Sequence, residues 1–195
     1  GAVTGTPNIS DRVRRGYGLF PRVAAPNQPI HLARLPAETG AARIERLHRP
    51  WHRAIGQGLA QAAARHGHAL LLDVHSMPRL DGDHPATLVL GDRHGRSAAP
   101  NLVGWLEAAF TARGLKVARN APYAGGHTTE RHAAPDGGIH CVQLEFDRTL
   151  YMDTATLRPH GGFQPLAALI ADVLAALEPA LPALGLGRPL PFAAE

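Results

Sequence analysis

An apolar run that ends abruptly in polar residues constrains the fold of this chain more than any other feature. Residues 69–72 read Ala-Leu-Leu-Leu and lead directly into Asp73, Val74, His75 and Ser76, before a turn rich in Pro, Asp and Gly. A short apolar run bounded by turn residues predicts a buried strand. Because strand side chains alternate between faces, Asp73 and His75 point the same way, about 6 to 7 Å apart. Open α/β sheets bind ligands at this carboxyl end of a strand.

A second predicted strand, IHCVQLEF at residues 139–146, ends in the same way. Alternation places Gln143, Glu145 and Asp147 on one face of it. A buried carboxylate is costly unless it is paired, so Glu145 needs a cation, a metal-bound water or Arg148 nearby. A structural salt bridge or a capped strand end would meet the same need. Two strands that end in polar groups nevertheless predict a site where they converge.

Helical patterns alternate with these strands. Residues 38–66 carry an apolar stripe at three- and four-residue steps, and Pro50 predicts a kink or two consecutive helices there. The remaining predicted elements are strands at 87–90 and 115–118, helices at 100–113 and 163–177, and a loop at 121–138. A loop of that length is usually functional or mobile. Strands that alternate with helices predict an α/β domain with a mostly parallel or mixed sheet.

Length and composition favour a single globular domain over residues 1–195. The segment 1–36 is predicted to be irregular because Gly and Pro interrupt it, and 179–195 is predicted to be an extended tail. The formal charge is +4 and the basic residues are scattered, so we expect no nucleic-acid partner.

The chain has one cysteine, Cys141, so no intrachain disulfide can form and a reducing compartment fits. No apolar run of membrane-spanning length stands out and the first residues do not read as a signal peptide. We therefore expect a cytoplasmic protein without a membrane partner.

Further polar residues in the connections are candidates for ligand binding. Arg93 and Arg148 suit bidentate recognition of a carboxylate, although most arginines only solvate a surface. Asn120 and Tyr123 precede a Gly-Gly pair that would let backbone approach a ligand. His127 and Glu130 have the His-x-x-Glu spacing of a zinc pair, but so short a pattern arises easily by chance in a chain with 12 His.

From about Arg14 to Leu157 the chain resembles the N-formylglutamate amidohydrolase family. Six blocks carry the resemblance in order: GYGLFPRV with a later IH (16–31), ARIERLHRPWHRAI (42–55), LLLDVHSMP (70–78), LVLGDRHGRS (88–97), VARNAPYAGGHTTERH (117–132) and GGIHCVQLEFDRTLYMD (137–153). The resemblance implies a zinc-carboxypeptidase-like fold of the phosphorylase/hydrolase-like kind. This is a three-layer α/β/α sandwich around a mostly parallel or mixed sheet, here shortened at its N-terminus.

The function implied by the resemblance is zinc-dependent hydrolysis of N-formyl-L-glutamate to formate and L-glutamate, a step of histidine degradation. His75 corresponds to the last zinc ligand of the family, and Glu145 to the carboxylate that activates the metal-bound water. The candidates for holding the small-molecule substrate are Arg93, Asn120 and Arg148, with Tyr123 close by. Asp73 could orient the His75 imidazole from behind, or be a structural carboxylate.

The sequence departs from the family at the metal site. A catalytic zinc normally takes three protein ligands, and family members supply two from an earlier segment with a PHSG-like motif. Residues 1–36 contain a single histidine, His31. The chain is then a piece of a longer protein, a divergent member that recruits His127 and Glu130, or a metal-free ligand-binding relative.

Two further expectations follow from the resemblance and from the missing earlier segment. A hydrolase of another N-acyl amino acid or peptide amide is the alternative enzyme function. Loss of an early strand predicts an exposed sheet edge or a homo-oligomer.

Overall fold

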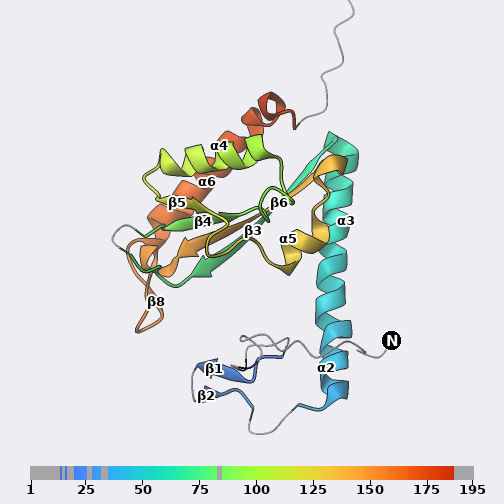
Figure 1. Ribbon diagram of the computed structural model, residues 1–195, viewed down its shortest axis with the longest axis vertical. Helices are drawn as coiled ribbons and strands as arrows, with labels where there is room; N and C mark the ends of the chain where they lie inside the picture. The colour runs from blue at the N-terminus through green and yellow to red at the C-terminus, as the bar shows by residue number, and fades with distance from the viewer. Residues whose placement is uncertain are drawn as a thin grey trace, which may run out of the picture. The chain divides into compact units, whose positions relative to one another are not determined.

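A computed structural model describes residues 14, 16, 20–25, 28–31, 35–82 and 85–186 of the chain (Figure 1). It contains two compact units, residues 1–53 and 54–195. The expectation of a single domain over residues 1–195 stays a prediction.

The first unit contains a short β-hairpin and the beginning of a long helical run. Strands β1 (Val23–Ala25) and β2 (Gln28–Pro29) pair antiparallel, so the prediction of an irregular segment at 1–36 is wrong for these residues. Most of the other residues up to 34 lie outside the described part of the chain. The helical run consists of α2 (Ala37–Arg43), the π-helical η1 (Ile44–His48) and α3 (Arg49–His66), the last of which extends into the second unit.

The sequence predicted that Pro50 would kink this run or divide it into two consecutive helices. Pro50 falls in the first turn of α3, where proline is tolerated, and α3 continues beyond it to His66. The widened π-helical turn comes immediately before it. Proline removes one backbone hydrogen bond and crowds the preceding turn, and a π-helical turn relieves that crowding at the cost of regular geometry. Two members of the predicted apolar stripe, Leu47 and Trp51, are exposed.

The second unit alternates strands and helices, as the sequence predicts. Its elements are β3 (Ala69–Met77), β4 (Leu88–Gly91), α4 (Pro100–Thr111), β5 (Val117–Arg119), α5 (His127–His132), η2 (Pro135–Gly137), β6 (Ile139–Asp147), η3 (Arg148–Leu150), β7 (Met152–Asp153), β8 (Arg158–Pro159), α6 (Phe163–Ala180) and η4 (Pro182–Leu184). Strands β7 and β8 form a separate antiparallel pair.

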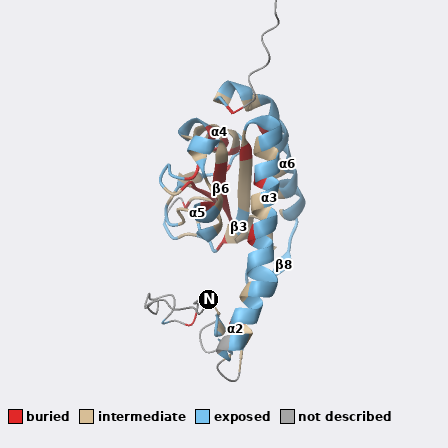
Figure 2. Ribbon diagram, turned by 90° about the vertical axis from the view of Figure 1, so that its right-hand side faces the viewer, coloured by how far each residue is buried: buried red, intermediate tan, exposed pale blue. Residues whose placement is uncertain are grey.

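The central sheet has the strand order β3-β6-β4-β5. Strand β6 runs parallel to β3 and antiparallel to β4, while β4 and β5 are parallel. This mixed sheet confirms the predicted α/β fold class. Burial is concentrated on β6 (Figure 2), of which every residue after Ile139 is buried.

Helices cover both faces of the sheet. On one face, apolar residues of β4 and β6 form a single core with α4 and α6, and Phe110 of α4 meets Phe146 of β6 edge to face at 5.9 Å. On the other face, α5 contacts β3 and β6. The Cys141 side chain is buried. Burial, with a smaller contribution from the Asp73 carboxylate, raises the pKa of this thiol to about 11.

Two predicted segments differ from the structure. The predicted loop at 121–138 contains the helix α5 and the 3₁₀ turn η2. The predicted tail at 179–195 is wrong at its start, since α6 continues through Ala180 and η4 follows, whereas residues 187–195 lie outside the described part. The helix α5 and the 3₁₀ turns η2 and η4 are too short, or too close to Pro and Gly, to show a periodic pattern.

Helix α6 is also more apolar than expected. By length and composition alone its 18 residues would suffice to cross a membrane, with a mean hydropathy of 1.3. Its Val173 and Leu177 are buried in the core against α4 and the sheet. Because 11% of the helix is buried, α6 covers the sheet with one face, as an outer helix of an α/β domain does.

The outer edge of β3 is open in the part of the chain that the structure describes, because β3 pairs only with β6. This agrees with the exposed sheet edge expected from the sequence.

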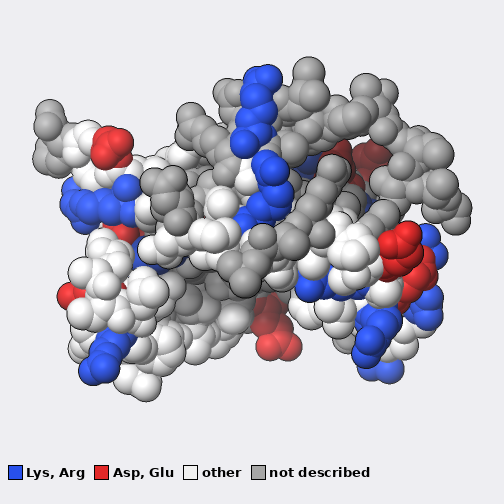
Figure 3. Space-filling view, turned by 90° about the horizontal axis from the view of Figure 1, so that it is seen from below, with Lys and Arg blue, Asp and Glu red and all other residues white. Residues whose placement is uncertain are grey.

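Charged side chains form separate groups on the face shown in Figure 3, where Lys and Arg occur beside Asp and Glu.

Candidate active site

The pairing of β3 with β6 brings four polar side chains together on one face of the sheet. In the parallel register, Asp73 lies beside Gln143 and His75 lies beside Glu145. Register partners in neighbouring strands point to the same face and are about 4.8 Å apart. The sequence predicted that these two polar strand faces converge, and the register is the reason that they do.

Asp73 and His75 are hydrogen-bonded to each other, with Oδ1 and Nε2 3.0 Å apart. An ionised carboxylate can only accept, so Nε2 carries the proton and Nδ1 of the neutral ring keeps a lone pair. The His75 side chain is 49% exposed, whereas that of Asp73 is 19% exposed. An imidazole whose other nitrogen is held by a carboxylate is the usual arrangement of a zinc-bound histidine.

Gln143 and Glu145 form a second hydrogen-bonded pair and both are buried. The Gln143 amide donates from Nε2 to Oε1 of Glu145 at 2.6 Å, and its own Oε1 accepts from the backbone N–H of Gly126 at 2.6 Å. This amide therefore satisfies part of the demand for partners that a buried carboxylate makes. Asp147, further along the same face, accepts from the backbone and hydroxyl of Thr149, so its role is to cap η3.

The loop 124–126 lies directly against the sheet at Gly91, the register partner of Gln143 in β4. A Cβ atom at position 91 would stand 2.5 Å from the Gly125 nitrogen and 2.8 Å from the Ala124 carbonyl carbon. The loop is also held by Arg93, whose backbone N–H donates to the Ala124 carbonyl at 2.7 Å. Only glycine at position 91 allows this approach.

We expect Gly91→Ala to destabilise the protein by about 1 to 3 kcal/mol, because backbone rather than a flexible side chain must move. Chemical denaturation would measure the change in the free energy of unfolding. The control is Gly58→Ala in α3, where a Cβ would meet nothing within 4 Å and where alanine favours the helix by about 0.5 to 1 kcal/mol. Equal stability of the two variants would contradict the close approach of the loop.

Asn120 organises the turn that follows β4. Its Oδ1 accepts from the backbone N–H groups of Asp92 and His94, at 3.1 and 3.2 Å, and its Nδ2 donates to Oδ1 of Asp92 at 2.7 Å. The φ angles of Arg93, His94 and Asn120 are 56°, 57° and 59°. Such left-handed conformations cost about 1 to 3 kcal/mol each and persist where the surroundings enforce them. The described contacts of Asn120 thus support the turn that presents Arg93.

Arg93 and Arg148 lie toward opposite ends of β6. Because β4 is antiparallel to β6, Gly91 is level with Gln143, and Arg93 continues toward the amino end of β6. Arg148 follows the carboxyl end of β6. About seven residues of strand, at ~3.3 Å each, therefore separate the position on β6 that is level with Arg93 from Arg148. The sequence could not show this, because strand direction is not encoded in the local pattern.

Each of these arginines already has a partner. Arg93 donates to Oε1 of Glu130 at 2.8 Å, which engages the carboxylate that a His127–Glu130 metal pair would need. Arg148 donates from Nε to Ser76 Oγ and from a terminal nitrogen to the Ser76 carbonyl, both at 3.2 Å. Tyr123 is half-buried in the loop between β5 and α5.

A cavity of about 580 Å³ lies between the carboxyl end of β3 and helix α6. Its polar lining is His75, Ser76, Arg148 and Tyr151, and its apolar lining includes Phe163, Leu166 and Ile170. Two of the predicted site residues, His75 and Arg148, line this cavity, whereas Glu145, Arg93 and Asn120 do not.

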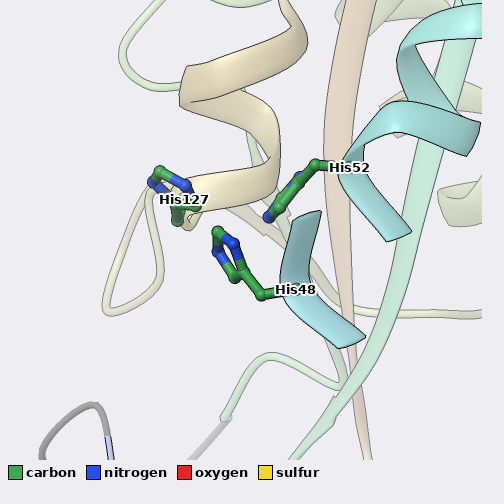
Figure 4. Close-up of side chains that lie close together, drawn as sticks. All are labelled: His48, His52 and His127. Carbon is green, nitrogen blue, oxygen red and sulfur yellow. The ribbon is translucent and has the colours of Figure 1, made fainter. Parts of the chain in front are cut away.

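In the first unit, two further imidazoles lie next to each other. His48 and His52 are four residues apart on the helical run, with ring centroids 4.4 Å apart, edge to face (Figure 4). The third side chain labelled there, His127, belongs to the second unit and begins α5. Two histidines at this spacing on a helix can bind one metal ion. The HRPWH block of the sequence contains this pair at helical spacing, a signal that could have indicated it.

The side chains on this face of the sheet can supply one of the protein ligands of a zinc site. His75 with Asp73 supplies one ligand and its orienting carboxylate, and a catalytic zinc usually takes three protein ligands. Among the described residues, no group of three potential ligands that lie close enough together to share a metal ion includes His75. Zinc at His75 would therefore need further ligands.

Comparisons with known proteins agree with these observations. A family model described as N-formylglutamate amidohydrolase matches residues 5–152. N-formylglutamate deformylases of Pseudomonas aeruginosa and Pseudomonas putida are each 33% identical, over 143 and 145 residues, covering 70% of this chain and 54% of each relative. The chain thus spans about half the length of the curated relatives that it matches.

Solved structures give the same result for the fold. The crystal structure of N-formylglutamate amidohydrolase from Ralstonia eutropha superimposes with a TM-score of 0.77 at 31% identity, covering 89% of this chain and 64% of that chain. A protein from Agrobacterium tumefaciens, at 23% identity and a TM-score of 0.54, covers 73% of this chain and 55% of its own and shares the fold.

Proposed function

Because the chain belongs to the N-formylglutamate amidohydrolase family, we propose that it hydrolyses the amide bond of N-formyl-L-glutamate with the help of zinc, yielding formate and L-glutamate. The observation that carries this proposal is the in-register placement of His75 beside Glu145. It sets a metal-binding imidazole next to a buried carboxylate, the two groups that amide hydrolysis of this kind requires. Action in histidine degradation, a cytoplasmic location and a homo-oligomer are parts of the same proposal.

Glu145 acts as the general base. Its Oε1 is occupied by the Gln143 amide, so Oε2 takes a proton from the attacking water. The water oxygen bonds to the formyl carbon, the C–N bond breaks, and Glu145 returns the proton to the leaving amine. His75, held by Asp73, would be one zinc ligand. Bound zinc would polarise the formyl oxygen and acidify the water.

Release of formate from N-formyl-L-glutamate by the full-length protein tests the proposal. We expect turnover that depends on added zinc and a preference over N-formyl-L-alanine, which lacks the second carboxylate. Absence of formate at any zinc concentration would refute the substrate assignment. Binding of N-formylglutamate without turnover would identify a ligand-binding relative instead.

Arg148 is the better placed of the two candidate arginines, because it directly follows the carboxyl end of β6, the strand that carries Glu145, and lines a cavity with His75. We expect Arg148→Met to lower kcat/KM for N-formylglutamate by about 10- to 150-fold, the loss expected for a hydrogen bond to a charged group. N-formyl-L-alanine should be affected far less. Arg93→Met is the matched comparison, and a larger loss in that variant would transfer the carboxylate-binding role to Arg93.

A further inference from the structure

We propose that Gln143 is a positioning residue that fixes the catalytic carboxylate of Glu145 and ties it to the loop 124–126. The inference rests on the proposed function, since it gives Glu145 its role as base. Gln143 is buried with 6% of its surface exposed and Glu145 with 7%. Both the amide oxygen and the amide nitrogen of Gln143 bond to groups of the protein, so its role is to position Glu145.

The two hydrogen bonds of Gln143 fix the orientation of its amide. The Gly126 N–H can only donate, so the oxygen of the Gln143 amide must face the loop. The amide nitrogen then faces Glu145, where it donates to Oε1. One side-chain amide thus connects a backbone donor on the loop with one oxygen of the carboxylate, and leaves Oε2 to exchange protons.

The loop to which Gln143 connects is itself firmly held. The Gly126 carbonyl accepts from Thr129 Oγ1 at 2.7 Å and from the Glu130 N–H at 3.1 Å, both at the start of α5. A Cβ at Gly126 would come 3.2 Å from the Gln143 oxygen, so a side chain there would press on the amide. The position of α5 is therefore transmitted through Gly126 and Gln143 to Glu145.

Two substitutions separate the contacts of Gln143. Gln143→Met keeps the length of the side chain but removes both hydrogen bonds. Gln143→Glu keeps an acceptor for the Gly126 N–H but, when ionised, cannot donate to Glu145. We expect both to lower kcat by about 10- to 100-fold, as small misplacements of catalytic groups do, while KM changes by less than about threefold.

The control for stability is Val142→Ala, which removes buried volume from the adjacent residue on the opposite face of β6. It should lower the melting temperature without lowering kcat. A double-substitution cycle with Glu145→Gln tests whether Gln143 acts through Glu145. In the Glu145→Gln background, Gln143→Met should cause no further loss of turnover. Independent, multiplying losses would overturn the inference, as would a kcat within about threefold of wild type.

Hydrogen exchange of the Gly126 amide provides a readout that does not depend on turnover. It should be protected in the wild-type protein and in Gln143→Glu, and exchange at least about tenfold faster in Gln143→Met. Unchanged exchange in Gln143→Met would overturn the link to the loop. If wild-type protein releases no formate, the proposed function fails together with the catalytic part of this inference, and the exchange experiment alone decides the link.

Discussion

Glu145→Gln is expected to lower formate release from N-formylglutamate by about 10²- to 10⁴-fold, the contribution typical of a general base. Glutamine has the same shape and can still accept the hydrogen bond that Gln143 donates to position 145. It cannot take up a proton at neutral pH. The variant should therefore fold normally and bind substrate, so the loss should fall on kcat rather than on KM.

Glu107→Gln is the matched control, because Glu107 is a half-exposed carboxylate of α4 that pairs with Arg119 away from the site. Its activity should equal that of the wild type. Circular dichroism and the melting temperature would establish that both variants are folded. If Glu145→Gln retained activity within a few-fold of wild type, another group would have to serve as base.

His75→Ala is expected to weaken zinc binding by about 10- to 100-fold or more, since losing a ligand should exceed the loss of an outer partner. Zinc content after dialysis, measured by plasma mass spectrometry, would give the result directly. Asp73→Asn should produce a smaller loss, because it removes the charge that orients the imidazole but keeps an acceptor for Nε2.

Three histidines serve as comparisons for zinc binding. His66→Ala changes an exposed imidazole at the end of α3 and should leave zinc content unchanged. His52→Ala disrupts the pair with His48, and His127→Ala tests the ligand that the sequence suggested. Zinc that survives loss of His75 but not loss of His52 or His127 would move the metal away from the sheet.

Much of the secondary structure could be predicted because it follows from local periodicity. Strands β3 and β6 were recognisable as apolar runs, and α4 and α6 as helical patterns within a few residues of their observed ends. The predicted faces were also correct, since alternation in a strand needs no tertiary information. Helix α5 escaped prediction because its six residues, preceded by a Gly-Gly pair and soon followed by Pro135, carry too little pattern.

For the candidate site, too, local features could be predicted from the sequence and long-range ones could not. The chemical types and faces of His75 and Glu145 follow from the sequence, as does the family. That His75 lies beside Glu145 depends on a nine-residue parallel register between segments some 70 residues apart. The roles of Gln143 and Asn120 depend on hydrogen bonds to segments that the local pattern does not bring together.

By itself, the sequence determined the α/β class, the family and which residues face the same side of each strand, because these depend on short-range periodicity and ordered motifs. The tertiary structure alone decided that β4 runs antiparallel to β6, which places Arg93 and Arg148 toward opposite ends of that strand. It also decided that, among the described residues, the exposed sheet edge belongs to β3. Both are outcomes of long-range strand pairing, in which the same alternating pattern can join either neighbour in either direction.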